Sequence, residues 1–262
     1  MQSLTDDVAD PLADLTFYHT VEFGPGRWTA GWPAVVPIVD MIVDTMATLD
    51  FRGKRVLDVG CRDGALSFEA ERLGAAAVLG VDFDLPLETT RFLTGALGSH
   101  VRFARRNVYD LTPAQDGLFD IILLPGLLYH LRYPVLGLRR ARDLLHASGT
   151  LLVETATFAD SNRFPLLLCP TGDASPYEPT SCSFFNIEGF VQTARSLGLA
   201  VTAHRSLLNL RLADPPDDAP LPIDRTVFIC TRDSGLDDVT TQNYWDGNLG
   251  GPRPPNWKGE AE

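Results

Sequence analysis

A glycine-bearing turn between an apolar run and an amphipathic run constrains the fold of this chain more than any other feature. The apolar residues Val56, Leu57 and Val59 stop at Gly60, and Gly64 closes the turn before the amphipathic segment begins. This order predicts a strand, a tight turn and a helix. Glycines let a ligand approach the backbone, and the start of a helix offers unpaired N–H groups. The unit therefore predicts a nucleotide-binding crevice at the end of the strand.

Carboxylates around this turn narrow the class of ligand. Asp82 ends the next predicted strand. A carboxylate at this position can accept hydrogen bonds from both hydroxyls of a ribose, so the expected ligand contains an adenosine. Asp58 precedes the first glycine and Asp63 precedes the last, so two acids would repel the pyrophosphate of a dinucleotide. A nicotinamide-dependent oxidoreductase is disfavoured for that reason. The acids suit a ligand that carries an ammonium and a sulfonium.

The run Asp58-Val-Gly-Cys-Arg-Asp-Gly64 resembles motif I of the class I S-adenosylmethionine (SAM) methyltransferases, and the resemblance extends over about residues 28–232. Arg62 replaces the usual middle glycine, so we expect its side chain to point away from the methionine part of SAM. The resemblance implies SAM as the cofactor and S-adenosylhomocysteine as the product. The resemblance also implies which residues bind the cofactor, namely Asp58, Gly60, Cys61, Arg62, Gly64, Asp82, Phe83, Asn107, Val108 and Pro125.

Two further runs resemble one subgroup of this family. Leu128-Tyr-His-Leu-Arg-Tyr-Pro134 and the strand ending Val153-Glu-Thr155 are most similar to the wobble-uridine tRNA carboxymethyltransferases and their relatives of unassigned substrate. This similarity admits the carboxylated form of SAM as donor, which would need a cation beside the methyl position. Arg27 and Arg163 are candidates for that cation, but ordinary SAM is the simpler expectation. No metal is expected, because the loop after Pro125 lacks the acids that would hold Mg²⁺.

The expected reaction is methyl transfer to a hydroxyl of a small molecule, such as a sugar or a secondary metabolite. His130 follows the predicted fourth strand and is the candidate catalytic base, although a histidine there can also merely orient the donor or a backbone group. His19 is the second choice. The alternatives are a tRNA wobble-uridine (carboxy)methyltransferase and a SAM-binding protein without transferase activity, in which Arg62 marks the loss of catalysis.

Two segments outside the nucleotide-binding core are expected to form the acceptor side. Residues 1–33 are aromatic-rich and irregular, and we predict that they lie as a lid across the carboxyl ends of the strands. Residues 156–185 form an insert over the acceptor site. The candidate substrate-binding residues are Trp28, Tyr129, Glu154, Arg163, Tyr177 and Phe184. Trp32 and Phe185 would join Trp28, Tyr177 and Phe184 in an apolar lid. Tyr129 can instead be a core residue, and Glu154 can instead hold a backbone N–H.

Alternating strand and helix patterns predict an α/β fold, a Rossmann-like doubly wound sheet of seven strands with an antiparallel edge hairpin. The methyltransferase domain is expected over 34–232, followed by an extended tail at 233–262, and the hairpin would turn through the proline-rich stretch at 214–220. Strands are expected near 54–59, 77–82, 100–105, 118–124, 149–155, 199–209 and 225–231, and helices near 37–49, 64–74, 86–97, 134–146 and 186–197.

The charge of the chain bears on its partners. The net charge is −12, from 34 acids and 22 bases, and this disfavours an RNA substrate without excluding a local basic groove. The basic clusters that would serve such a groove are Arg102, Arg105 and Arg106, and Arg132, Arg139, Arg140 and Arg142; for the second cluster a solvated helix face is favoured.

The location of the protein is expected to be cytoplasmic. The N-terminus lacks the order of a signal peptide, and the chain has no long apolar run that would make it a membrane protein. The four cysteines are scattered and read as reduced structural thiols. A monomer or a homodimer is expected.

Overall fold

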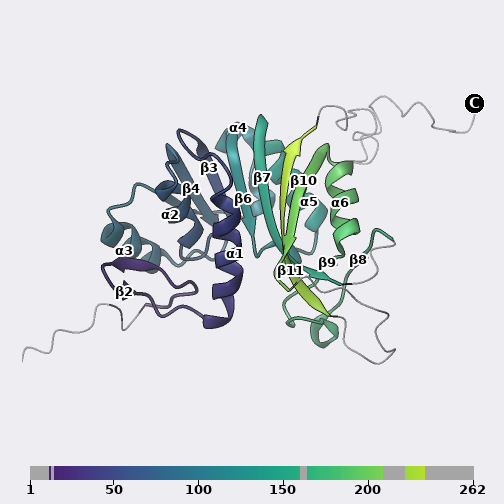
Figure 1. Ribbon diagram of the computed structural model, residues 1–262, viewed down its shortest axis with the longest axis horizontal. Helices are drawn as coiled ribbons and strands as arrows, with labels where there is room; N and C mark the ends of the chain where they lie inside the picture. Colours follow the sequence, from purple (N-terminus) through teal and green to yellow (C-terminus); the bar gives the residue numbers. More distant parts are fainter. Residues whose placement is uncertain (1–11, 13–14, 160–163, 209–221, 234–262) are drawn as a thin grey trace, which may run out of the picture.

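The computed structural model describes residues 12, 15–159, 164–208 and 222–233, and its centre is a sheet with helices on both faces (Figure 1). All seven predicted strands lie in this sheet, in the order β10-β11-β7-β6-β3-β4-β5. The predicted α/β fold is therefore confirmed. The bounds are β3 (Arg55–Val59), β4 (Ala77–Asp82), β5 (Arg102–Arg105), β6 (Phe119–Pro125), β7 (Leu145–Phe158), β10 (Leu199–Ser206) and β11 (Ile223–Arg232).

The strand order reverses beside β3. This strand pairs in parallel with β4 on one side and with β6 on the other, so the two halves of the sheet meet here. Open α/β sheets bind ligands at the carboxyl ends of their strands at such a switch point. The glycine turn follows β3, so the topology puts the predicted crevice between the loops after β3 and β6.

The antiparallel pair at the edge of the sheet is also present, with an arrangement that the sequence pattern did not specify. β11 pairs antiparallel with both β10 and β7, so β10 is the edge strand and β11 lies inside the sheet. As a consequence Arg225 of β11 stands opposite Ala156 of β7, in the interior of the fold.

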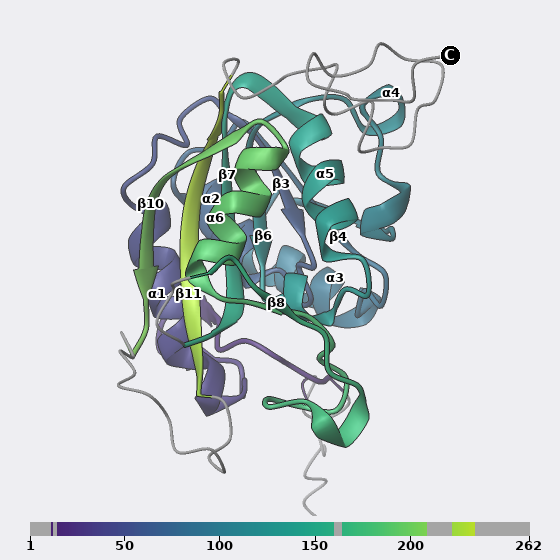
Figure 2. The same ribbon diagram turned by 90° about the vertical axis from the view of Figure 1, so that its right-hand side faces the viewer.

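Helices cover both faces of the sheet (Figure 2). Residues of α1 (Val36–Met46), α2 (Ala65–Arg72) and α3 (Leu87–Leu97) share one hydrophobic core with one face. Residues of α5 (Pro134–Leu144) and α6 (Ile187–Ser196) share a second core with the other face, while the short α4 (Pro113–Asp116) precedes β6. The helix predicted near 37–49 is confirmed, and its buried residues Ile38, Met41, Ile42 and Met46 recur at helical spacing.

The stretch before α1 is more regular than predicted. β1 (Glu22–Gly24) and β2 (Arg27–Trp28) form a small antiparallel hairpin, and a 3₁₀ turn, η1 (Pro33–Val35), leads into α1. The expectation of an irregular segment was wrong for this part, because Gly26 adopts the positive φ of 68° that a tight turn between two short strands requires.

The insert after β7 contributes to the sheet. It carries β8 (Leu167–Leu168), a 3₁₀ turn η4 (Gly172–Ala174) and β9 (Phe184–Phe185), and β9 pairs in parallel with β7 through Phe185 and Thr157. Phe184 and Phe185 are buried in the core. Phe185 packs in the core shared with α6, and Phe184 packs with Tyr129, while their predicted part in an apolar lid and the predicted substrate role of Phe184 stay predictions.

Some predicted features fall outside the described residues. They are Arg163, the proline-rich turn at 214–220 and the tail from residue 234 onward. Within the described ranges, no helix combines the length and the apolar character needed to cross a membrane.

Candidate functional site

The glycine turn after β3 has the backbone that a close ligand approach needs. Gly60 and Gly64 have φ values of 82° and 91°, a region that residues with a Cβ rarely adopt. A Cβ at Gly64 would overlap the ring of Phe103. Arg62 has a φ of 49° and is the non-glycine residue with a positive φ among those described. The turn is therefore built closely around its glycines, with Arg62 held in a sparsely populated conformation.

Asp82 is fixed by the same turn. The backbone N–H of Arg62 donates to Oδ2 at 3.0 Å and that of Asp84 donates to Oδ1 at 2.9 Å. Gly60 and Cys61 donate their N–H groups to the carbonyl of Val81, which ties the turn to the end of β4. Each carboxylate oxygen of Asp82 keeps capacity for a second hydrogen bond. The geometry suits the predicted recognition of ribose hydroxyls.

Asp58 provides a buried acceptor that lacks a partner. Its side chain is fully buried, and the hydroxyl of Ser67 donates to Oδ2 at 2.6 Å. No hydrogen bond reaches the other oxygen, Oδ1, within the described part of the chain. Burial raises the pKa of Asp58 to about 6, against the smaller opposing effects of Ser67 and His19. An ammonium on a bound ligand would satisfy Oδ1 and restore the ionised carboxylate, so this site fits the amino-acid end of SAM.

The side chain of Arg62 extends toward the N-terminal part of the protein. Its guanidinium lies 3.8 Å from a carboxylate oxygen of Asp84 and 5.6 Å from the ring centre of Tyr18. The predicted direction, away from the methionine part of SAM, stays a prediction. Cys61 beside it is buried, and burial raises the pKa of its thiol far above the usual range, so it is a neutral packing group.

The N-terminal residues 15–32, which we call the strap, are fastened to the glycine turn by Asp63. Its Oδ2 accepts the N–H groups of Tyr18 at 2.7 Å and His19 at 2.9 Å, and its Oδ1 pairs with Nδ1 of His19. Asp63 and His19 are both buried. Although burial is the largest influence and acts to raise the pKa of Asp63, the bonds and charge of His19 outweigh it and hold that pKa below the usual value. The strap thus lies at the predicted end of the sheet.

A buried ion pair that sequence reasoning missed stands on the other side of the site. The guanidinium of Arg225 donates to both carboxylate oxygens of Glu154, at 2.7 and 2.8 Å. Glu154 also accepts the N–H of Gly126 at 3.0 Å, so of its two predicted roles the backbone one is seen. Arg225 donates further to the hydroxyl of Tyr177 at 2.9 Å and lies 4.8 Å from the ring centre of Tyr129. Tyr129 is buried, which agrees with the core alternative.

His130 closes the 3₁₀ turn η3 (Leu128–His130) after β6, at the rim of this cluster. Its Nε2 lies 3.3 Å from a carboxylate oxygen of Glu178, and about a third of its side chain is exposed. Burial lowers the pKa of His130, and the charges of Arg225 and Arg62 add to this, against an opposing effect of Glu178. The imidazole is therefore neutral at neutral pH, as a proton acceptor must be.

Electrostatics link the two sides of the site. The charges of Arg62, next to the glycine turn, and of Arg225, in the ion pair, both act on His130 and on Tyr18. On one side the guanidinium of Arg62 lies 5.6 Å from the ring centre of Tyr18, and on the other the rings of Tyr129 and His130 have centres 4.3 Å apart. Tyr18 was not among the predicted residues.

The remaining predicted residues surround the same end of the sheet. Phe83 follows Asp82 and is 69% exposed, and Trp28, Trp32 and Tyr177 are also exposed. Asn107 caps the 3₁₀ turn η2 (Val108–Asp110) by accepting the N–H of Tyr109 at 3.0 Å, and Val108 is buried. Pro125 ends β6. Their roles in binding stay predictions.

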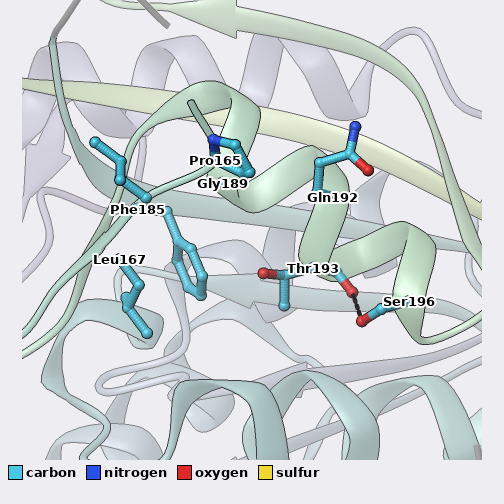
Figure 3. Close-up of a pocket in the computed structure, with 8 residues that line it drawn as sticks. Pro165, Leu167, Phe185, Gly189, Gln192, Thr193 and Ser196 are labelled. Carbon is cyan, nitrogen blue, oxygen red and sulfur yellow. Dashed lines mark hydrogen bonds between the residues drawn. The ribbon is translucent and has the colours of Figure 1, made fainter. Parts of the chain in front are cut away.

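A separate hollow of about 250 Å³ lies between the insert and α6 (Figure 3). Phe185 and Leu167 point into it from the insert, and Thr193 faces it from the helix, where Ser196 donates to the carbonyl of Thr193 at 2.7 Å. None of the residues of the glycine turn lines it, so it is distinct from the predicted crevice. Within the described residues, no group of three or more His, Cys, Asp or Glu side chains is arranged to hold a metal ion.

The strand order, the internal antiparallel strand β11 and the acid-lined glycine turn define a SAM-binding α/β domain of class I. A sequence profile described as a methyltransferase domain matches residues 38–204, which is more than half of the chain. The chain belongs to this methyltransferase family, and its cofactor is SAM.

Individual relatives agree with this family and differ in what they act on. A tRNA U34 carboxymethyltransferase of Pseudomonas fluorescens (strain Pf0-1) is 36% identical over 112 residues, which are 41% of this chain and 34% of that protein. A ubiquinone biosynthesis O-methyltransferase of Neisseria meningitidis serogroup C (strain 053442) is 36% identical over 109 residues, 40% of this chain and 45% of that one. The chain thus spans about a third of the first relative's length and under half of the second's.

A solved structure supports the fold. The 1,6-didemethyltoxoflavin-N1-methyltransferase of Burkholderia thailandensis, crystallised with its named substrate and S-adenosylhomocysteine, superposes with a TM-score of 0.55 over 77% of this chain and 79% of that one. The two sequences are 20% identical, so the likeness concerns the fold alone.

Proposed function

We propose that this protein transfers the methyl group of SAM to a hydroxyl of a small molecule. The observation that carries the proposal is the polar, aromatic cluster around the Glu154–Arg225 pair, in which Arg225 bonds to Tyr177 and the ring of Tyr129 packs against those of His130 and Tyr177. Rings and hydroxyls of this kind hold an uncharged ring-bearing acceptor through packing and hydrogen bonds. The similarity to a ubiquinone biosynthesis O-methyltransferase supports a hydroxyl as the acceptor group.

The chain's residues would act mainly by positioning. SAM supplies an activated methyl group, so the acceptor oxygen needs an in-line approach to about 3 Å. In the transfer the oxygen forms a bond to the methyl carbon, the carbon–sulfur bond breaks with its electrons remaining on sulfur, and the hydroxyl proton leaves. His130 is placed to take that proton, because its lowered pKa leaves the imidazole unprotonated at neutral pH and its side chain is partly exposed beside Tyr129.

A tRNA wobble-uridine reaction is the second candidate, favoured by the 36% identity to the tRNA U34 carboxymethyltransferase. A carboxylated donor would need a free cation. Arg225 lies 4.8 Å from the ring centre of Tyr129, but Glu154 already neutralises it through two hydrogen bonds. In the basic clusters, Arg106 pairs with Asp116 at 2.9 Å and Arg105 donates to the carbonyl of Leu85. These internal bonds favour a structural role for both arginines, so ordinary SAM and a small acceptor remain the better proposal.

The experiment that tests the proposal is to incubate the protein with methyl-labelled SAM and two fractions of a host extract, small molecules and total RNA. Label in the small-molecule fraction, lost in the His130→Ala variant, is the expected result, and mass spectrometry of the product would identify the acceptor. Label in RNA would support the second candidate. Tight binding of S-adenosylhomocysteine with label in neither fraction would point to the non-catalytic SAM-binding protein.

A further inference from the structure

The strap has a conformation that depends on specific side chains. The hydroxyl of Thr29 donates to the carbonyl of His19 at 2.7 Å and accepts the N–H of Val21 at 2.8 Å. The N–H of Trp32 donates to the carbonyl of Tyr18 at 3.1 Å. A Cβ at Gly31 would overlap the backbone of His19, so only glycine fits there. The strap therefore has a defined fold, because Thr29 and Trp32 near its end are hydrogen-bonded to residues 18–21 near its start.

A single carboxylate joins this turn to the donor side of the protein. Asp63 accepts the backbone N–H groups of both Tyr18 and His19 and the ring nitrogen Nδ1 of His19. Asp63 is 1% exposed, so these bonds are sheltered from water. Charged hydrogen bonds are strongest in such a buried environment. Asp63 itself belongs to the glycine turn, between Arg62 and Gly64. The position of the strap is therefore coupled to the conformation of the turn that holds SAM.

The same bonds hold the ring of Tyr18 beside the glycine turn. Tyr18 and His19 lie in a bend, and their rings pack edge to face with centres 4.8 Å apart. The ring of Tyr18 lies 5.5 Å from that of Trp32 and 5.6 Å from the guanidinium of Arg62. Its hydroxyl also feels the charges of Arg225 and Glu178, which belong to the cluster on the far side of the site. Tyr18 thus contacts the strap through Trp32 and the glycine turn through Arg62.

We propose that the His19–Asp63 pair is a positioning device that sets the strap on the glycine turn and thereby places Tyr18 as an acceptor-binding residue. His19 acts through its bond to Asp63 and not as the catalytic base. This inference rests on the proposed methyl transfer for the role of Tyr18, while the fastening of the strap can be measured without any acceptor.

The test compares two substitutions of one residue. In His19→Asn the amide nitrogen occupies the place of Nδ1 and can still donate to Asp63, whereas His19→Ala removes the bond and leaves a buried carboxylate with fewer donors. Hydrogen exchange of residues 15–32, measured with S-adenosylhomocysteine, reports the strap directly. We expect His19→Ala to speed exchange at least tenfold and His19→Asn to leave it within about threefold of the wild type.

Turnover then separates positioning from catalysis. With methyl-labelled SAM and a dilution series of the host small-molecule extract, His19→Ala and Tyr18→Ala should raise the half-saturating extract concentration at least tenfold, with SAM affinity changed less than threefold. His19→Asn should recover most of the turnover with an unchanged pH profile. If His19→Asn lost turnover while its strap exchanged as slowly as in the wild type, the inference would be overturned and His19 would be the base. Unchanged exchange in His19→Ala would overturn the fastening itself.

These results do not depend on the proposed reaction alone. If the wild type labels no fraction of the extract, the proposed function fails, but the exchange rates still decide whether His19 and Asp63 hold the strap. If the wild type labels the extract and Tyr18→Ala does so with the same half-saturation, the methyl transfer stands and the role of Tyr18 is refuted.

Discussion

Replacing Asp58 with asparagine should stabilise the free protein while weakening its cofactor site. The carboxyl of Asp58 is fully buried, and one of its oxygens has no partner among the described residues. Its pKa rises from an ordinary 3.8 to about 6, mainly through burial. A pKa shift of about two units means that, at neutral pH, the ionised carboxyl lowers the free energy of unfolding by about 3 kcal/mol. Asparagine avoids the charge and can still bond to Ser67.

The sign of the effect follows from proton binding. The folded state holds the proton of Asp58 at a higher pH than the unfolded state does, so wild-type stability should fall as pH rises from about 4 to about 6. Asp58→Asn should lack this component. It should therefore be more stable than wild type by about 2–3 kcal/mol at pH 7.5 and equal to it near pH 4.

The assay is urea unfolding of both proteins across this pH range without SAM, followed by SAM titration at pH 7.5. Asp58→Asn should bind SAM at least tenfold more weakly, because the ammonium of the ligand loses its charged partner. Asp84→Asn is the matched control, since this carboxylate lies near the same turn and is 71% exposed. Parallel stability curves for wild type and Asp58→Asn across the whole range would refute the reasoning.

Two further predictions concern the acceptor side. Arg225→Met should destabilise the fold by about 3–5 kcal/mol, because it leaves Glu154 buried without its partner. The double variant Arg225→Met with Glu154→Leu should recover most of that loss in denaturant unfolding. Additive losses from the two substitutions would contradict the coupling. His130→Ala should lower turnover far more than SAM affinity. Wild-type turnover should fall as the pH drops below the lowered pKa of His130, and an acid limb that persists in His130→Ala would reduce this residue to a structural role.

The sequence predicted the elements whose signals are local. The strands around Gly60 and Asp82 and the helix with Ile38 and Met41 were found because apolar periodicity and glycines mark their bounds within a few residues. The β1–β2 hairpin was missed because its strands are too short to show a period. The burial of Phe184 and Phe185 was not predictable from the sequence, because an aromatic residue in an insert can face either the core or the solvent, and long-range pairing such as that of β9 with β7 is not visible locally.

The site was predicted in its cofactor half and only partly in its acceptor half, because the missing contacts join distant positions. Arg225 pairs with Glu154 across 71 residues, and the role of Tyr18 depends on Asp63, 45 residues later. A lone arginine in a strand near the end of the chain shows no local signal of a buried ion pair. The available hint that it points inward was that Ile223, Val227 and Ile229, at spacings of two, share its face of the strand.

SAM binding by calorimetry, in wild type and in two variants of the cofactor site, tests the central claim most directly. Gly60→Val puts a β-branched side chain at a φ of 82°, and Asp82→Ala removes the carboxylate that the turn orients. The account predicts that wild type binds SAM and S-adenosylhomocysteine, that both variants lose this binding, and that circular dichroism shows an intact fold for Asp82→Ala. SAM affinity that is absent in the wild type, or unchanged in both variants, would contradict it.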